Sequence, residues 1–155
     1  MSDAENSDAE TINAVEGYAG DITGPQAWNI LSNDPTSILV DVRTDAEWRY
    51  VGRADLSQLD REPLYVSWQL FETRDLNPDF VAEMNSALGT SDADAETPIM
   101  FLCRSGVRSQ SAAIAMTGQG FRRCYNIAGG FEGDLDENQH RGINGWKVDS
   151  LPWVQ

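Results

Sequence analysis

One short run of residues in this 155-residue chain combines a nucleophile, a glycine and two arginines. The run consists of Cys103, Arg104, Ser105, Gly106, Val107 and Arg108. An apolar segment precedes it and a segment rich in small residues follows, so it is expected to join a strand to a helix. Such a loop directs several backbone N–H groups at one point, and the helix dipole adds partial positive charge there. We therefore expect the loop to hold an anion and to favour the thiolate of Cys103, which is the nucleophilic form.

The loop is locally basic although the whole chain is acidic. Gly106 permits the backbone angles that a ring of N–H groups needs. Arg104 and Arg108 place two guanidinium groups in a stretch, residues 103–109, that holds no carboxylate. The formal net charge of -14 need not repel a small anion, because charges beyond about 8 Å are largely screened at physiological salt. The alternative is that Cys103 simply closes a strand and that both arginines are ordinary surface charges.

A second group of candidate residues follows another apolar run. Asp41 and Arg43 lie at the end of residues 37–42, and Glu47 lies in a helical turn that begins at Asp45. A carboxylate at this edge could take part in chemistry. A polar pair that leaves a buried strand more often forms a fixing ion pair, so we expect a supporting role for all three.

The pattern of apolar residues predicts the elements that position these groups. Strands are expected at residues 37–42, 63–68, 98–102 and 122–127, and helices at residues 25–31, 45–48, 77–88 and 108–116. Strands that alternate with helices indicate an α/β fold with a central, mostly parallel sheet and helices on both faces. Ligands of such sheets bind beyond the carboxyl ends of the strands, where Asp41 and Cys103 are expected.

Length and composition favour one globular domain. Hydrophobic residues make up 41% of the chain and charged residues 23%, which suits a single domain of about 100–200 residues. Residues 1–20 are polar and acidic without apolar periodicity, so we expect a flexible N-terminal arm. The domain would then cover residues 21–155 and include an extended C-terminal tail, which Trp146 and Trp153 are expected to anchor by burial.

Charge and residue usage disfavour several classes of protein. The excess of 25 acidic over 11 basic side chains disfavours binding to nucleic acid or to anionic lipid. The start of the chain lacks the features of a secretory signal, and no apolar run is long enough to span a membrane, so a cytoplasmic location is expected. The two cysteines form no Cys-x-x-Cys pair and the single histidine, His140, lies in a polar run. We therefore expect no metal site and no cofactor.

Cys124 is the other cysteine and opens the expected strand at 122–127. Cys103 ends its strand, so the two cysteines would lie at opposite edges of a parallel sheet, about 10 Å or more apart. A disulfide needs Cα atoms within about 7 Å. We therefore expect Cys124 to be structural and not a resolving thiol for Cys103.

These motifs together resemble those of the rhodanese-like sulfurtransferases, in particular the single-domain bacterial type. The run from Cys103 to Ser109 is similar to the active loop of that family. The resemblance extends to residues 41–43, to Glu47-Trp48 and to the Gly-Gly-Phe run at residues 129–131, and it spans residues 22–153. One departure is the run at residues 51–55, where the family usually has Gly-His-Ile-Pro-Gly-Ala.

The resemblance implies an enzyme that works by covalent catalysis. Cys103 would take the outer sulfur of a donor such as thiosulfate, release sulfite and carry a persulfide. A second nucleophile, either cyanide in an assay or a cellular thiol or protein, would then remove that sulfur. The loop amides from Arg104 to Arg108 would stabilise the persulfide, and the arginines would orient the donor. The implied partners are a small sulfur-containing anion and a thiol or protein acceptor, and the chain itself would be a monomer or weak dimer.

Two alternative functions remain open on the sequence. A cysteine-dependent phosphatase or arsenate reductase would use a similar ring of N–H groups, but it places five residues between cysteine and arginine. Here four residues separate Cys103 from Arg108, which makes a tighter ring. The other alternative is a sulfur carrier or regulatory binding module, which passes persulfide to a partner without significant turnover of free substrates.

Overall fold

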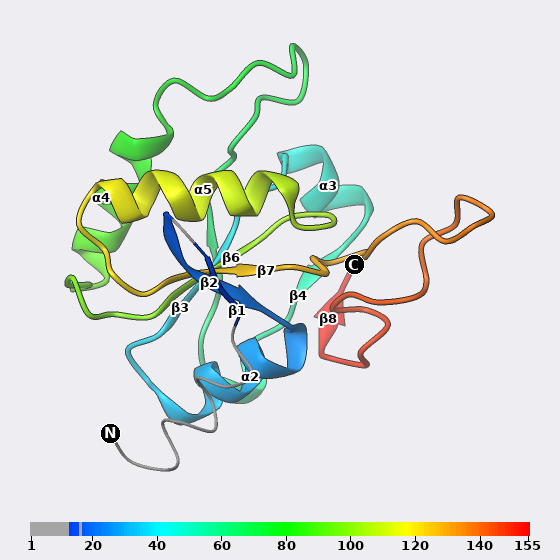
Figure 1. Cartoon of the computed structure of the whole chain (residues 1–155), viewed down its shortest axis with the longest axis horizontal. Coiled ribbons are helices and arrows are strands. Elements are labelled where there is room, and N and C mark those ends of the chain that lie inside the picture. The colour runs from blue at the N-terminus through cyan, green and yellow to red at the C-terminus, as the bar shows by residue number, and fades with distance from the viewer. Residues whose placement is uncertain (1–12, 16) are drawn as a thin grey trace.

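The computed structural model describes residues 13–15 and 17–155, and a six-stranded sheet forms its centre (Figure 1). The strand order is β1-β2-β7-β6-β3-β5. Strand β1 runs antiparallel to β2, and the remaining five strands are parallel to one another. The bounds are β1 Asn13–Val15, β2 Tyr18–Ile22, β3 Ile38–Asp41, β5 Leu64–Tyr65, β6 Ile99–Leu102 and β7 Cys124–Ile127.

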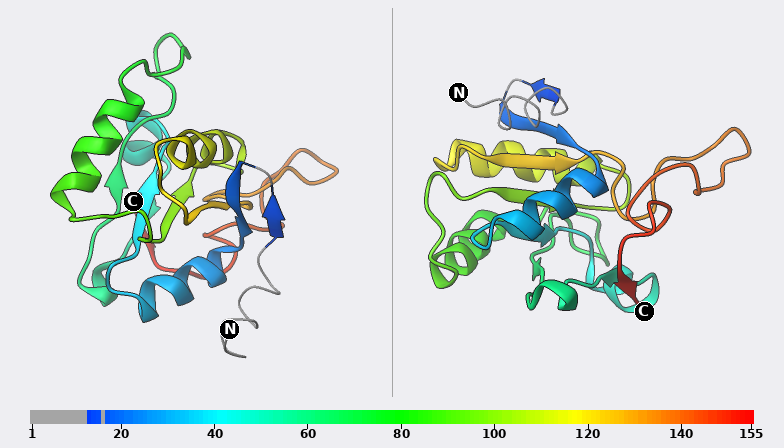
Figure 2. Two further views of the ribbon diagram at one scale, coloured as in Figure 1. Left: turned by 60° about the vertical axis from the view of Figure 1, so that its left-hand side comes forward. Right: turned by 90° about the horizontal axis from the view of Figure 1, so that it is seen from below.

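Helices cover both faces of this sheet (Figure 2). Helix α2, Gly24–Asn33, packs on one face, and α4, Phe80–Thr90, and α5, Val107–Gly118, pack on the other. All four residues of β6 and all four of β7 are buried, because these strands lie between two helical layers. The short helix α3, Asp45–Tyr50, follows β3 at the carboxyl edge of the sheet. This arrangement confirms the expected α/β class.

The N-terminal boundary of the sheet differs from the one expected. Strand β2 begins at Tyr18, inside the segment that composition indicated as part of a flexible arm. The residues Tyr18, Gly20 and Ile22 are buried in alternation with partly exposed ones, which is the period of a strand. The segment is dominated by polar residues, so this short alternation was not sufficient to predict a strand from the sequence. Residues 1–12 and 16 of the expected arm lie outside the described residues.

Two other elements differ in their limits. Helix α4 begins at Phe80 and not at residue 77. The Asn77 side chain accepts from the Asp79 amide and donates to the Ser67 carbonyl, so residues 77–79 form a turn before the helix. The strand expected at residues 63–68 is reduced to Leu64–Tyr65. A 3-10 turn at Ser57–Leu59 precedes it.

The C-terminal segment wraps back over the carboxyl edge of the sheet. Its last strand, β8 at Trp153–Val154, pairs with β4 at Arg53–Ala54. Trp146 is fully buried, and its indole donates to the Pro152 carbonyl at 2.7 Å. Trp153 is 37% exposed, so burial anchors the tail through Trp146 and strand pairing holds its end. The segment drawn in orange, near residue 140, projects from the domain (Figure 1). Among the described residues, no helix is long and apolar enough to cross a membrane.

Candidate active site

Cys103 lies directly after β6, at the carboxyl edge of the sheet. Its loop ends at Gly106, the residue before α5, and the Gly106 amide donates to Cys103 Sγ at 3.1 Å. Gly106 has a φ of 111° and no side chain that could cap the helix, so amides of the first turn stay available to an anion. The strand, loop and helix therefore have the order that the sequence predicted.

Two glycines allow this loop to pack against the loop that follows β7. A Cβ on Gly106 would overlap the carbonyl oxygen of Ala128, and a Cβ on Gly130 would lie 2.5 Å from the Arg104 carbonyl carbon. Hydrogen bonds join the two loops: the Phe131 amide donates to the Cys103 carbonyl at 2.8 Å. The Gly-Gly-Phe run is thus part of the support for the cysteine loop.

Arg108 is held in a bidentate ion pair with Glu47 on α3. Its two terminal nitrogens donate to the two carboxylate oxygens at 2.7 and 2.9 Å. Burial alone would raise the pKa of Glu47, but the hydrogen bonds and charge of Arg108 outweigh it, so the pKa lies below its usual value. Burial would likewise lower the pKa of Arg108, and Glu47 reverses that effect. The pair is therefore ionised at neutral pH and joins α3 to the start of α5.

Asp41 and Arg43 form a second, more deeply buried ion pair. Arg43 Nη2 lies 2.7 Å from Asp41 Oδ2, and Nε lies 3.0 Å from Oδ1. The Arg43 side chain is completely buried, also donates to the Gly52 carbonyl at 2.8 Å and stacks 4.4 Å from the centre of the Phe131 ring. The ion pair expected at the end of β3 is present, and it connects β3 to the segments on both sides of the cysteine loop.

The opening beside the cysteine loop is a cavity of about 330 Å³. Arg104 and Arg108 line it from the loop and α5, and Thr44 and Glu47 line it from α3. The loop between β5 and α4 contributes the rest of the lining: Gln69, Leu70, Phe71 and Arg74. Arg74 was not among the residues selected from the sequence, because 30 positions separate it from Arg104 and only the fold brings the two together.

Cys103 directly precedes Arg104, which lines this cavity, but is itself buried. The residue is 1% exposed and is not among those that line the cavity. Val107, the first residue of α5, is 73% exposed and stands at the surface beside the loop. Access of a reagent to the buried sulfur therefore requires a displacement of the cysteine loop.

Ser109 belongs to the run that resembles the family's active loop, but it was not predicted to be a site residue. Its hydroxyl lies 3.2 Å from Cys103 Sγ, and the residue is completely buried. Its position in the first turn of α5 is a signal that the sequence offered, since a side chain there points back toward the preceding loop.

Cys124 lies far from this site along the sheet. It pairs in register with Ile99 at the start of β6, whereas Cys103 follows the end of that strand. Burial raises the pKa of the Cys124 thiol to about 11, so it stays protonated at neutral pH. Both cysteines are free, and the expected separation of the two is confirmed.

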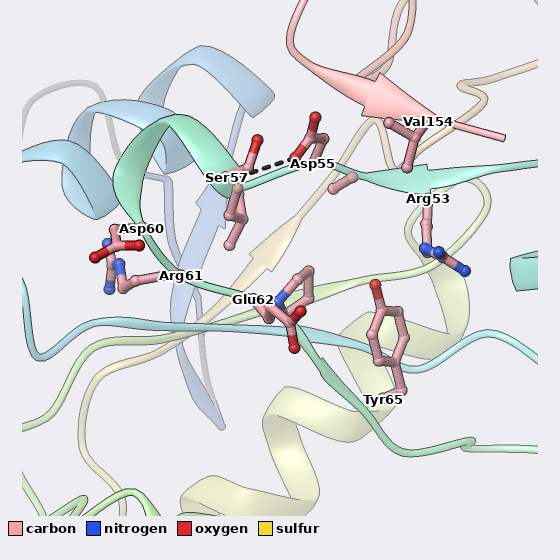
Figure 3. A pocket seen from close by; sticks show the side chains of 11 residues that line it. Arg53, Asp55, Ser57, Asp60, Arg61, Glu62, Tyr65 and Val154 are labelled. Atoms are coloured by element: carbon pink, nitrogen blue, oxygen red, sulfur yellow. Dashed lines mark hydrogen bonds between the residues drawn. The ribbon is translucent and has the colours of Figure 1, made fainter.

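A larger cavity of about 670 Å³ lies near β4 and β8 (Figure 3). Its lining is partly apolar and partly polar, and the charged and polar side chains include Arg53, Asp55, Asp60, Glu62 and Tyr65. Arg61 at its edge donates to the backbone carbonyls of Leu31 and Ser37. The cavity holds neither cysteine, so we place the candidate site at Cys103.

The other sequence expectations concern metals and His140. Within residues 13–15 and 17–155, no group of three or more His, Cys, Asp or Glu side chains is arranged to hold a metal ion. His140 lies in the projecting part of the C-terminal segment and its side chain is exposed.

The fold and the cysteine loop define a class that comparison with known proteins supports. The fold is rhodanese-like. The crystal structure of Rv0390 from M. tuberculosis superimposes with a TM-score of 0.79 at 48% identity, covering 89% of this chain and 98% of that one. The polysulfide-sulfur transferase homodimer of Wolinella succinogenes has a TM-score of 0.55 at 19% identity over 97% and 82% of the chains, a likeness of fold alone.

Sequence comparison then identifies the family. A family model described as the STR4 middle domain matches residues 20–155, and the chain belongs to that family. An uncharacterized protein of Rickettsia rickettsii is 39% identical over 132 residues, which are 85% of this chain and 94% of the relative. The thiosulfate sulfurtransferase GlpE of Actinobacillus pleuropneumoniae is 27% identical over 113 residues, which are 73% and 83% of the two chains.

Proposed function

We propose that this protein is a sulfurtransferase that moves sulfane sulfur from a donor such as thiosulfate to a thiophilic acceptor through a persulfide on Cys103. The observation that carries the proposal is the position of Cys103 Sγ, which accepts a hydrogen bond from Gly106 at 3.1 Å just before the first turn of α5. Backbone N–H groups at a helix start stabilise an anion there. The distant relationship to GlpE supports the same reaction.

The first half of the reaction loads the cysteine. The Cys103 thiolate attacks the outer sulfur of thiosulfate, a new S–S bond forms, and the old S–S bond breaks as sulfite leaves with its electron pair. The product is a persulfide with its charge on the outer sulfur. Amides of the loop and of the first turn of α5 stabilise that charge in place of water. A thiol or cyanide then attacks the outer sulfur and restores the Cys103 thiolate, which gives ping-pong kinetics.

The arginines of the site have different tasks in this proposal. Arg108 is neutralised by Glu47 and fixes the start of α5, so it is a positioning residue. Arg104 and Arg74 line the cavity, and no described carboxylate pairs with either one. These two guanidinium groups attract and orient the anionic donor. The reaction requires no metal and no cofactor.

The test is intact-protein mass spectrometry after exposure to thiosulfate. We expect the mass to rise by one sulfur atom, cyanide to remove that atom, and peptide mapping to place it on Cys103. The Cys124→Ser variant is the matched control and should gain the same atom. A mass that stays unchanged after prolonged exposure, with the protein folded, would contradict the proposal.

A sulfur carrier is the second candidate function, and the apolar surface beside the loop favours it. Val107 is 73% exposed and Phe71 in the cavity wall is 59% exposed, and such side chains suit contact with a protein partner. Cys103 itself is buried, so in this alternative the partner opens the loop. Slow transfer from thiosulfate to cyanide, combined with rapid exchange of persulfide with a partner protein, would favour the carrier.

The geometry disfavours a phosphatase. The Glu47 carboxylate takes one N–H of each terminal nitrogen of Arg108 and neutralises its charge, so this guanidinium is a weaker partner for the doubly charged phosphoryl group of a phosphatase substrate. Hydrolysis of an aryl phosphate at a rate that rivals sulfur transfer from thiosulfate would favour the phosphatase over the sulfurtransferase.

Replacement of Arg74 tests the proposed binding of the donor. Arg74→Gln removes one unpaired cation from a cavity open to solvent, a change of about 1 kcal/mol in donor binding. We expect the KM for thiosulfate to rise about fivefold while kcat changes less than twofold. Arg49→Gln is the control, since Arg49 lies on α3 but does not line the cavity. Equal effects of the two substitutions would show that only overall charge matters.

A further inference from the structure

A buried chain of polar side chains leads away from Cys103 through the sheet. Ser109 Oγ lies 3.2 Å from Cys103 Sγ and 2.5 Å from Asn126 Oδ1 on β7. Asn126 Nδ2 in turn donates to Asp21 Oδ1 on β2 at 3.0 Å. Ser109 and Asn126 are 0% and 3% exposed. Each contact must therefore be satisfied by the donors and acceptors of the side chains themselves.

Asp21 fixes the orientation of the Asn126 amide. An ionised carboxylate can only accept hydrogen bonds, so the group that faces it must be the NH₂ of Asn126. The Tyr18 hydroxyl donates to the same Asp21 oxygen at 2.7 Å, which leaves that oxygen with two donors. With its NH₂ directed at Asp21, Asn126 presents its carbonyl oxygen to Ser109.

The Ser109 hydroxyl then has two neighbours that compete for one proton. Asn126 Oδ1 can only accept, so at 2.5 Å the Ser109 hydroxyl donates its hydrogen bond to this oxygen. Only a lone pair of Ser109 Oγ remains for the sulfur. That lone pair suits a Cys103 thiol, which can donate its proton, and does not suit a thiolate, which needs a donor. The Gly106 amide is unaffected and donates to the sulfur in both states.

From this geometry we infer that Ser109, Asn126 and Asp21 are positioning residues that withhold one hydrogen bond from the Cys103 thiolate and so favour the thiol in the empty site. The second consequence rests on the proposed function. In a persulfide the negative charge lies on the outer sulfur, near the loop amides, so Ser109 keeps its bond to Asn126 at no cost. The hydrogen bonds of Ser109, Asn126 and Asp21 therefore disfavour the bare Cys103 thiolate relative to the persulfide.

The charged and titratable groups around the sulfur come from every neighbouring element. They are Arg104 in the loop, Asp41 and Arg43 after β3, Glu47 on α3, Arg108 on α5, Tyr18 and Asp21 on β2, and Lys147 in the C-terminal segment. Asp41 and Glu47 are paired with Arg43 and Arg108, respectively. Substitutions of Ser109, Asn126 or Asp21 leave both ion pairs intact, so their effects on the ionisation of Cys103 come from the hydrogen bonds among these three residues.

The test measures the pH dependence of alkylation of Cys103 by iodoacetamide, a small neutral reagent, with peptide mapping to separate it from Cys124. Asn126→Leu removes the competing acceptor and frees the Ser109 proton for the sulfur. We expect the midpoint of the profile to move about one pH unit toward acid, a tenfold change in the ionisation constant. Ser109→Ala alone should move it toward acid by less than about 0.3 unit, because Ser109 does not donate to the thiolate and the hydrogen bond that it accepts from the weakly donating thiol contributes little.

The double variant Asn126→Leu/Ser109→Ala separates this inference from a structural effect. We expect it to return the midpoint to the wild-type value, since the acid shift in Asn126→Leu requires the Ser109 hydroxyl. An alkaline shift of about one unit in Ser109→Ala alone, or an acid shift that survives in the double variant, would overturn the inference. A purely structural role would not make the Ser109 substitution silent in one background and large in the other.

Asp21→Asn provides a second route if Asn126→Leu does not fold, because the Asp21 side chain is only partly buried. Without the carboxylate, Asn126 can turn its NH₂ toward Ser109, and an acid shift that requires the Ser109 hydroxyl is expected. Loss of the Asp21 charge alone would act without that hydroxyl, because salt screens buried groups only weakly, so an acid shift of the same size in Asp21→Asn/Ser109→Ala contradicts the inference. Alkylation needs no sulfur donor, so these results stand even if no persulfide forms with thiosulfate.

Discussion

Cys103→Ser is expected to lower the rate of sulfur transfer from thiosulfate to cyanide by at least about a thousandfold, because a hydroxyl cannot replace the thiolate as the attacking group. The fold should survive. A serine oxygen at this position can still accept a hydrogen bond from the Gly106 amide and contact the Ser109 hydroxyl. These are the two interactions that Cys103 Sγ makes in the wild-type protein. The free energy of unfolding should therefore change by no more than about 1 to 2 kcal/mol. Steady-state kinetics and urea unfolding measure the two quantities.

Cys124→Ser is the matched control for this substitution. Cys124 is also completely buried, and its thiol lies 3.6 Å from the Phe121 carbonyl, so a serine there should cost a similar amount of stability. Its thiol lies at the opposite edge of the sheet, and burial keeps it protonated. We expect Cys124→Ser to retain at least half of the wild-type rate. Equal losses in the two folded variants would show that Cys103 is not the sulfur carrier.

The buried parallel strands were predictable because each one lies in a short, mostly apolar run. Ile38–Asp41, Ile99–Leu102 and Cys124–Ile127 all lie within the predicted segments. Strand β2 was missed, since its alternation of buried and partly exposed residues is only five residues long and contains a glycine and an aspartate. The two-residue strands β4 and β8 have no signal in the sequence, because pairing between distant segments creates them.

The cysteine loop was predictable for the same local reason: its residues are consecutive, and the strand before it and helix after it are both clear. The partners of those residues were not. Arg108 was expected to orient a donor, yet Glu47, 61 positions away, occupies both of its terminal nitrogens. Arg74 and Ser109 acquire their significance from distances that only the folded chain defines. Local sequence thus predicts which group could react, and tertiary contacts decide which neighbours act on it.

Asp41→Asn is expected to destabilise the protein by about 3 to 5 kcal/mol, because it leaves a buried guanidinium without a counter-charge. Asp41 and Arg43 are 1% and 0% exposed, and Arg43 Nη1 already lacks a hydrogen-bond partner among the described residues. Asparagine keeps the size of the side chain, so the loss reports on charge and not on a cavity. Urea unfolding at neutral pH measures it. A protein of this size has a total stability of about 5 to 15 kcal/mol, so the variant approaches the limit of folding at 37 °C.

The second ion pair of the site is the matched control, since it has the same chemistry with more solvent. The side chains of Arg108 and Glu47 are 17% and 19% exposed, so water can partly replace a lost partner, and Glu47→Gln should cost no more than about 1 to 2 kcal/mol. The double variant Asp41→Asn/Arg43→Met removes both buried charges and should recover much of the loss in Asp41→Asn. If Asp41→Asn lowered the free energy of unfolding no more than Glu47→Gln, burial would not explain the contribution of the Asp41–Arg43 pair to stability. The guanidinium stacked on Phe131 would then have to be stabilised without Asp41.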